Sequence, residues 1–151
     1  MNKIIRKIQY SEKVYRFDVE APLIAKSRKA GNFVIIRVDA NSERMPLTIA
    51  DADIEKGTIT LVVQKVGLSS TKLCNLNEGD EIHDVVGPLG NPTHIENFGT
   101  VLCAGGGVGV APMLPIIKAL KAAGNRVLSV IAGRSKDLVI MEDEVAHQAT
   151  S

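Results

Sequence analysis

Residues 1 to 90 alternate between short apolar runs and polar turns. The clearest run is residues 57–66, where Ile59, Leu61 and Val63 share one face of an extended strand and polar residues share the other. Six short strands separated by turn residues predict an antiparallel barrel or sandwich. The predicted strands are residues 3–11, 14–21, 33–39, 45–51, 57–66 and 81–90, and the predicted short helices are residues 22–28 and 70–80.

After Asn97 the pattern changes to that of a parallel strand–helix–strand unit. Short apolar strands are predicted at residues 99–105 and 125–133, on either side of a helix. We therefore place a boundary near Asn97, between a domain of residues 1–97 and a second domain of residues 98–151. The helix is predicted at residues 110–124 from the helical spacing of Val110, Met113, Leu114, Ile117 and Leu120 and from Gly124 at the C-cap, and residues 138–148 begin a further strand or helix.

Composition and charge exclude several classes of protein. The 45% of hydrophobic residues is typical of a chain that forms a globular core. A net charge of +1 and an aromatic content of 3% argue against nucleic-acid and membrane-surface partners. No apolar run reaches the ~20 residues of a membrane span, and the N-terminal residues lack the apolar segment of a signal peptide, so we expect a cytoplasmic location.

The remaining polar and sulfur residues give few signs of chemistry of their own. Cys74 and Cys103 lack metal-ligand spacing, so we expect two buried thiols and no metal site. No acid–base pair is visible, so no catalytic side chain is assigned. An acidic run is expected to form a solvated face; it consists of Asp137, Glu142, Asp143 and Glu144.

The stretch CAGGGVGVAP, residues 103–112, concentrates four glycines between a predicted strand and a predicted helix. The unpaired N–H groups at a helix N-terminus attract phosphate, and glycines let a pyrophosphate approach the backbone. The alternative is a tight strand-to-helix turn without a ligand. The motif is G-x-G-x-x-P rather than the usual dinucleotide motif, and Arg134 stands where an acidic reader of the ribose is expected.

These motifs together resemble the ferredoxin–NADP⁺ reductase superfamily. GGGVGVAP follows a strand and is preceded by GPLG at residues 87–90. The resemblance implies a six-stranded antiparallel flavin-binding barrel followed by a partial Rossmann-like nucleotide-binding domain. The family's flavin motif in the fourth strand is R-x-Y-[ST]. Here Thr48 matches the hydroxyl position, Leu47 replaces the aromatic residue, Met45 takes the usual place of the arginine and Arg44 precedes it.

Within the superfamily, RMPLTIAD and TITLVVQKVG resemble the small subunit of NADH-dependent ferredoxin:NADP⁺ oxidoreductase. They also resemble the electron-transfer subunit of dihydroorotate dehydrogenase. The resemblance implies FAD and NAD(P)H as cofactors, with hydride passing between the nicotinamide and the flavin. The implied FAD residues are Arg44, Pro46, Leu47, Thr48, Val63, Gln64, Lys65, Gly67, Ser69, Ser70 and Thr71, and the implied NAD(P) residues are Gly105, Gly106, Gly107, Gly109, Val110, Ala111, Pro112, Arg134 and Ser135.

The chain departs from the family pattern after Arg134. The family's nucleotide domain continues for further strand–helix units, whereas this sequence stops at Ser151, so we expect a C-terminally truncated member. A [2Fe–2S] cluster takes four cysteine ligands, so the cluster is expected in the missing segment.

The implied partners are a larger flavin and iron–sulfur oxidoreductase subunit and a ferredoxin-type acceptor, and the fragment could form a homodimer. An inactive, flavin-independent binding or assembly fragment is the alternative. The choice between NADH and NADPH stays open.

Overall fold

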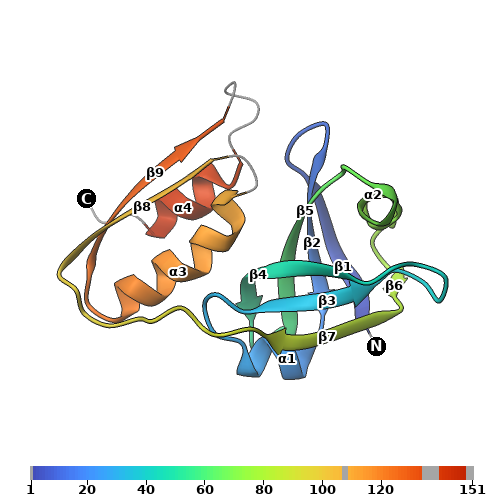
Figure 1. The fold of residues 1–151 in the computed structure, drawn as a ribbon, viewed down its shortest axis with the longest axis horizontal. Helices are drawn as coiled ribbons and strands as arrows, with labels where there is room; N and C mark the ends of the chain where they lie inside the picture. The colour runs from blue at the N-terminus through green and yellow to red at the C-terminus, as the bar shows by residue number, and fades with distance from the viewer. Residues whose placement is uncertain (1, 107–108, 134–139, 149–151) are drawn as a thin grey trace.

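The computed structural model describes residues 2–106, 109–133 and 140–148, which form a curled sheet and a smaller α/β part (Figure 1). Gly107, Arg134 and Ser135, which the resemblance assigns to the nucleotide site, lie outside these residues. No helix in the described ranges is both long and apolar enough to span a membrane. The elements are β1 (Asn2–Gln9), β2 (Val14–Glu20), α1 (Pro22–Ser27), β3 (Phe33–Arg37), β4 (Met45–Asp53), β5 (Thr58–Gln64), α2 (Leu68–Cys74), β6 (Glu81–Ile82), β7 (Asp84–Leu89), β8 (Thr100–Gly106), α3 (Val110–Ala122), β9 (Arg126–Ala132) and α4 (Glu142–Gln148).

The first part is an antiparallel barrel, as the sequence predicts, but its sheet has seven strands rather than six. Their order is β6-β1-β2-β5-β4-β3-β7. The run predicted as one strand, residues 81–90, is divided at His83, because β6 pairs with β1 while β7 pairs with β3. β6 and β7 therefore stand at opposite ends of the strand order although one residue separates them in the chain. The sheet has to curl for this to happen, and that closes the barrel.

The barrel encloses its own hydrophobic core. Alternate residues of each strand point inward, so Ile59, Leu61 and Val63 of β5 are buried together, as their spacing predicts. Phe17 of β2 is fully buried among them. The helices α1 and α2 cover the barrel with side chains such as Ile24 and Leu73. Every fully buried member of this cluster comes from residues 4–82.

The α/β part consists of a two-stranded parallel sheet and two helices. β8 and β9 pair in register from Thr100 with Arg126 to Gly106 with Ala132. α3 begins and ends close to the predicted positions, and Gly124 takes a positive φ of 94° after its last turn. Residues 142–148, left open between strand and helix, form α4. The predicted apolar face of α3 is buried: Val110, Met113, Leu114, Ile117 and Leu120.

α3 lies between the β8–β9 sheet and the barrel and contacts both (Figure 1). Successive residues of β4 divide between two cores: Ile49 points into the barrel, whereas Ala50 packs in the cluster around α3. Val14 of β2 joins the same second cluster. The core of the α/β part is therefore completed by barrel residues, and the division of the chain near Asn97 stays a prediction.

A buried asparagine that the sequence analysis missed holds the connection between the two parts. The Asn125 Oδ1 accepts hydrogen bonds from the backbone N–H groups of Phe98, at 2.6 Å, and Gly99, at 3.0 Å. Its Nδ2 donates to the carbonyl oxygens of Glu96, at 2.8 Å, and Leu120, at 2.9 Å. One side chain thereby fixes the linker to the end of α3.

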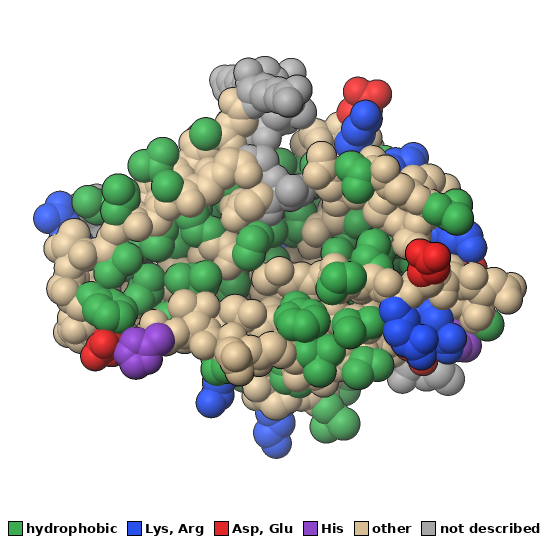
Figure 2. All heavy atoms as spheres, in the orientation of Figure 1, with side chains coloured by type: hydrophobic (Ala, Val, Ile, Leu, Met, Phe, Trp, Pro, Cys, Tyr) green, Lys and Arg blue, Asp and Glu red, His purple; other side chains and the backbone are tan. Residues whose placement is uncertain are grey.

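The other face of the β8–β9 sheet is apolar and exposed. Leu102 of β8 stands beside Leu128 of β9, and Val130 follows on the same face, with Leu102 66% exposed. Phe98 in the linker is also exposed. On the side drawn in Figure 2, charged side chains gather toward the outer ends of the molecule and hydrophobic ones occupy much of the middle.

Candidate functional site

An open groove of about 430 Å³ lies on the barrel between the start of β4, the end of β5 and the start of α2. It collects residues that stand far apart in the sequence and that the flavin motif predicted. The predicted residues in its lining are Pro46, Leu47, Val63, Gln64, Gly67, Ser69 and Ser70, and the others are Glu43, Met45, Val66 and Leu68.

The two strands give the groove an apolar floor. Met45 and Leu47 are half-buried, because their side chains rest on the barrel core. Val63 is 1% exposed, so its side chain belongs to the core and its backbone is the part that a ligand can reach. Gln64 follows on the opposite face of β5 and is exposed, which leaves its amide free to donate and accept hydrogen bonds.

The start of α2 forms the polar wall of the groove. The Ser70 Oγ accepts hydrogen bonds from the N–H groups of Val66, at 3.0 Å, and Gly67, at 2.8 Å, and donates to the Gly67 carbonyl at 3.1 Å. Ser70 therefore caps its own turn, and its hydroxyl is already engaged. Ser69 is half-buried, and the first N–H groups of a helix have no acceptor within the helix. Ser69 and these N–H groups are the polar groups that α2 offers to a ligand.

The remaining predicted flavin residues stand outside the lining. Arg44 is exposed, and no described residue accepts a hydrogen bond from it or forms an ion pair with it. Thr48 is half-buried on the outer face of β4, the face that Ala50 turns toward the α/β part. The Lys65 N–H donates to the Lys13 carbonyl, and the Thr71 N–H continues α2 by donating to the Gly67 carbonyl.

The sequence analysis did not assign four lining residues to the site, and one of them, Met45, was noted only as occupying the usual place of the arginine. Glu43 precedes the motif, and Val66 and Leu68 flank the glycine before α2. Val66 is 74% exposed and Leu68 is 78% exposed. The sequence did contain one sign of this part of the site, because Val66 and Leu68 are large apolar residues on either side of Gly67. A loop that serves only as a turn seldom carries two such residues.

The described glycines at the end of β8 serve different purposes. A Cβ on Gly105 would lie 3.2 Å from the Gly109 carbonyl oxygen and 3.2 Å from the Met113 sulfur, so glycine lets the strand approach α3 closely. A Cβ on Gly106 would make an ordinary contact of 3.5 Å with the Ala132 carbonyl oxygen. Gly109 precedes the first residue of α3, and a Cβ there would meet no described atom within 4 Å. Among the described residues, none therefore crowds this end of the helix.

The other predicted nucleotide residues pack α3 onto its neighbours. Val110 is fully buried, Ala111 is buried and Pro112 is half-buried. Their side chains shape the start of the helix, and a ligand there would meet backbone groups rather than these side chains.

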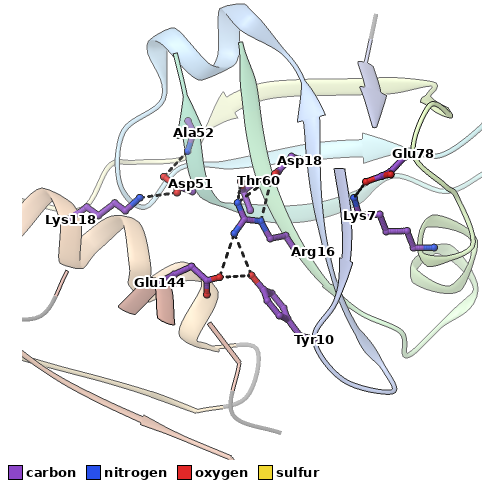
Figure 3. Close-up of polar contacts among 10 residues, drawn as sticks. All are labelled: Lys7, Tyr10, Arg16, Asp18, Asp51, Ala52, Thr60, Glu78, Lys118 and Glu144. Atoms are coloured by element: carbon purple, nitrogen blue, oxygen red, sulfur yellow. Dashed lines mark hydrogen bonds and ion pairs between the residues drawn. The ribbon is translucent and has the colours of Figure 1, made fainter. Parts of the chain in front are cut away.

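Polar contacts join the barrel to the α/β part (Figure 3). The Lys118 Nζ lies 2.8 Å from the Asp51 Oδ2, which links α3 to β4. On α4, the Glu144 Oε1 lies 3.7 Å from the Arg16 Nη1 and accepts a hydrogen bond from the Tyr10 hydroxyl at 3.4 Å. The expectation of a solvated acidic face is thus wrong for Glu144, although it holds for the exposed Glu142 and Asp143, and Asp137 lies outside the described residues.

These contacts shift the pKa values of the groups around Arg16. Burial disfavours the charge of Arg16, but its hydrogen bond with Tyr10 and the negative charge of Asp18 outweigh burial and raise its pKa above the ordinary value. Burial raises the pKa of Tyr10, against the opposing hydrogen bond from Arg16. Arg16 therefore stays charged and Tyr10 stays protonated at neutral pH.

Both cysteines are buried, as predicted, and burial raises the pKa of each thiol. Among the described residues no cluster of three or more His, Cys, Asp or Glu side chains could hold a metal ion.

Comparisons with known proteins give a consistent set of relatives, although no family model matches the chain. It is 48% identical over 144 residues to a Thermotoga maritima homologue of the electron-transfer subunit of dihydroorotate dehydrogenase B (NAD⁺), covering 95% of this chain and 51% of the relative. It is 32% identical over 142 residues to that electron-transfer subunit from Bacillus caldolyticus, covering 90% of this chain and 55% of the relative. The chain thus spans about half the length of these relatives.

The solved structures agree in fold. The structure of NADH-dependent reduced ferredoxin–NADP oxidoreductase, described in a study of flavin-based electron bifurcation, matches with a TM-score of 0.96 and 44% identity, over 99% of this chain and 55% of that chain. Ferredoxin–NADP⁺ reductase from Plasmodium falciparum matches with a TM-score of 0.77 and 17% identity, over 97% of this chain and 63% of that chain. The second match bears on the fold alone.

Proposed function

We propose, from the premise that this chain belongs to the ferredoxin–NADP⁺ reductase superfamily, that it is the flavin-binding part of an electron-transfer subunit. The observation that carries the proposal is the groove on the barrel. It gathers residues from β4, β5 and α2 that a flavin motif assigns to one ligand. The pairing of β4 with β5 and the short link from β5 to α2 bring these segments together, so what the groove adds is an accessible hollow lined by the motif residues.

The groove has room for part of a flavin dinucleotide, and its polar groups are distributed in a way that suits one. Its volume lies within the range of ordinary ligand pockets. The apolar floor of Met45, Pro46 and Leu47 offers contact to a flat apolar ring. Thr48, the hydroxyl position of the motif, follows Leu47 in β4 but stands outside this lining. The first turn of α2 and Ser69 offer donors to phosphate oxygens, and Arg44 stands one residue from the lining as the nearby cation.

A nicotinamide nucleotide would bind at the start of α3. Gly105 and Gly106 bring the backbone to this point, and no described residue crowds Gly109, where a phosphate would bind. The ion pairs of Lys118 with Asp51 and of Glu144 with Arg16 join α3 and α4 to the barrel, so the two proposed binding regions lie on parts of the chain that contact each other. A bound flavin supplies hydride and single-electron chemistry, and the protein contributes positions and electrostatics.

Electrons would leave toward a partner that carries iron–sulfur chemistry. A [2Fe–2S] cluster takes four cysteine ligands, whereas this sequence holds two cysteines, both buried. The names of the dihydroorotate dehydrogenase relatives describe an electron-transfer subunit, in keeping with a larger partner. The names of the relatives point to two different redox partners, a dihydroorotate dehydrogenase in one case and a ferredoxin in the other, and the same groove could serve either.

Titration with FAD tests the proposal. The purified chain is expected to bind one FAD, with a yellow colour and quenched flavin fluorescence. Ser69→Trp should fill the groove and weaken binding by at least about tenfold, because the indole would occupy the ligand's volume. Ser27→Trp places the same side chain on the exposed surface of α1 and should bind FAD normally. A wild-type chain that binds no FAD, or a Ser69→Trp variant that binds it unchanged, would overturn the proposal.

A further inference from the structure

The groove holds one charged side chain, and its sign is opposite to what phosphate binding would favour. Of the described residues that line the groove, Glu43 alone carries a charge. No described residue donates a hydrogen bond to this carboxylate or forms an ion pair with it. A free carboxylate beside a pyrophosphate repels it, unless another part of the ligand donates hydrogen bonds to the carboxylate.

The loop that carries Glu43 is fixed, so the carboxylate has a defined place. Asp39, in the same loop, accepts hydrogen bonds from the Asn41 N–H at 2.9 Å and from the Ser42 hydroxyl at 2.8 Å. The Lys72 Nζ on α2 lies 3.5 Å from the Asp39 Oδ2 and 3.3 Å from the Ser42 Oγ. The loop acid Asp39 is thus used to tie the loop to α2, whereas Glu43 in the same loop is left for a ligand.

A carboxylate accepts hydrogen bonds and donates none, so its partner has to bring hydroxyl or amine protons. A flavin dinucleotide offers such groups in the ribityl chain and in the ribose of its adenosine, and FMN offers only the ribityl chain. Glu43 and Leu47 both line the groove and are four residues apart, which separates them by up to roughly 13 Å at ~3.3 Å per residue of extended chain. A flavin ring resting on the apolar floor at Leu47 would leave Glu43 toward the other end of the ligand, where the adenosine would lie.

We propose that Glu43 accepts hydrogen bonds from the ribose hydroxyls of the adenosine and makes the groove select FAD over FMN. This inference rests on the proposed function, because it assigns one end of the same ligand. An acidic residue reads ribose hydroxyls in the same way in dinucleotide-binding α/β domains, since a carboxylate can accept from two neighbouring hydroxyls. Here the acid lies on a barrel loop.

The test compares FAD and FMN titrations of the full chain and its Glu43→Gln variant by flavin fluorescence. Glu43→Gln should weaken FAD binding about tenfold, as expected for a lost hydrogen bond to a charged group, and leave FMN binding unchanged. ADP should also compete with FAD less strongly in the Glu43→Gln variant than in the wild type, by a similar factor. Glu55→Gln makes the same charge change in the exposed turn between β4 and β5 and should alter neither affinity.

Three other outcomes would overturn the inference, each for a different reason. FAD binding that is unchanged or tighter in Glu43→Gln would show a rim charge that only repels phosphate. An equal loss for FAD and FMN would place the carboxylate at the ribityl chain. A wild-type chain that binds neither flavin would remove the proposed function itself, which distinguishes that failure from the first two. Thermal unfolding of the variant at the wild-type temperature would show that the exposed substitution leaves the fold intact.

Discussion

The barrel builds its hydrophobic core from its own residues, whereas the α/β part completes its core with residues of the barrel. The barrel core draws its fully buried members from residues 4–82 alone. The cluster around α3 includes Val14 and Ala50 of the barrel, with Tyr10 and Val62 packed against it. The barrel strands form one curled seven-stranded sheet in which five strands are paired on both sides, whereas β8 and β9 form a two-stranded sheet with one exposed apolar face.

This difference implies a dependence in one direction. The α/β part needs the barrel to bury its helix α3, while the barrel keeps its own core if the α/β part opens. Each part carries one buried cysteine, Cys74 in the barrel and Cys103 in the α/β part. The rates at which these two thiols are alkylated therefore report the opening of each part separately.

Loss of the largest barrel side chain should affect both parts. Phe17→Ala removes a fully buried ring and should lower the free energy of unfolding by about 3–5 kcal/mol. Because the α/β part rests on the barrel, both thiols should become reactive together. Urea unfolding followed by alkylation and mass spectrometry measures this. Leu23→Ala, at an exposed position of α1, is the control, and protection of Cys103 after Phe17→Ala would contradict the one-way dependence.

A cavity in the second core should separate the two parts. Ile117→Ala deletes a fully buried side chain of α3, and such changes cost about 2–5 kcal/mol. Cys103 should be alkylated much faster while Cys74 keeps its wild-type rate, because the barrel core is untouched. The same alkylation assay, without denaturant, tests this. Simultaneous exposure of both thiols would mean that the two parts unfold as one unit.

Replacing Asn125, whose side chain fixes the linker to the end of α3, should destabilise the α/β part less than Ile117→Ala does. Asn125→Ala leaves the backbone donors of Phe98 and Gly99 without their acceptor, and an unsatisfied buried polar group costs about 1–3 kcal/mol. The midpoint of urea unfolding read at Cys103 should fall, with little change at Cys74. Asn91→Ala removes an exposed asparagine and serves as the control. An unchanged midpoint would mean that the linker needs no such anchor.

The ion pair between the two parts should contribute least. Lys118→Met removes the partner of Asp51 and keeps an unbranched apolar side chain of similar length. Both members are partly exposed, so the expected loss is at most about 1 kcal/mol and should shrink as salt is added. Thermal unfolding at low and high ionic strength measures it. Lys121→Met, on the exposed side of the same helix, should change nothing, and a salt-independent loss in Lys118→Met would point to packing instead.

The sequence predicted the parts of the fold that depend on local periodicity. The α3 face from Val110 to Leu120 and the alternation of β5 are confirmed, because each reflects one buried face of a regular element. The split at His83 could not be predicted, because it depends on which strands lie on either side of residues 81–90.

In the candidate site, too, local motifs could be predicted from the sequence, whereas contacts with distant neighbours could not. The motif residues of β4 and β5 do meet α2 in one groove, yet their roles as ligands of a flavin stay predictions. Ser70 is one of the implied FAD residues, yet its hydroxyl caps its own turn, and Glu144 was expected to be solvated but pairs with Arg16. Both roles depend on neighbours that a residue's type does not reveal. Glu43 went unnoticed because a lone acid before a strand has no distinguishing pattern.

The closure of the barrel through β6 and β7 has a consequence for amide hydrogen exchange. Each of β1, β2, β3, β4 and β5 has a paired strand on both sides, so none of them can open without breaking two ladders. Their protected amides should exchange with deuterium only through opening of the whole barrel, and at similar rates. β8 is held by β9 alone among the described strands, so its amides can exchange through a local opening that leaves the barrel closed. The exchange pattern should therefore divide the chain into a slow, uniform barrel and a faster α/β part.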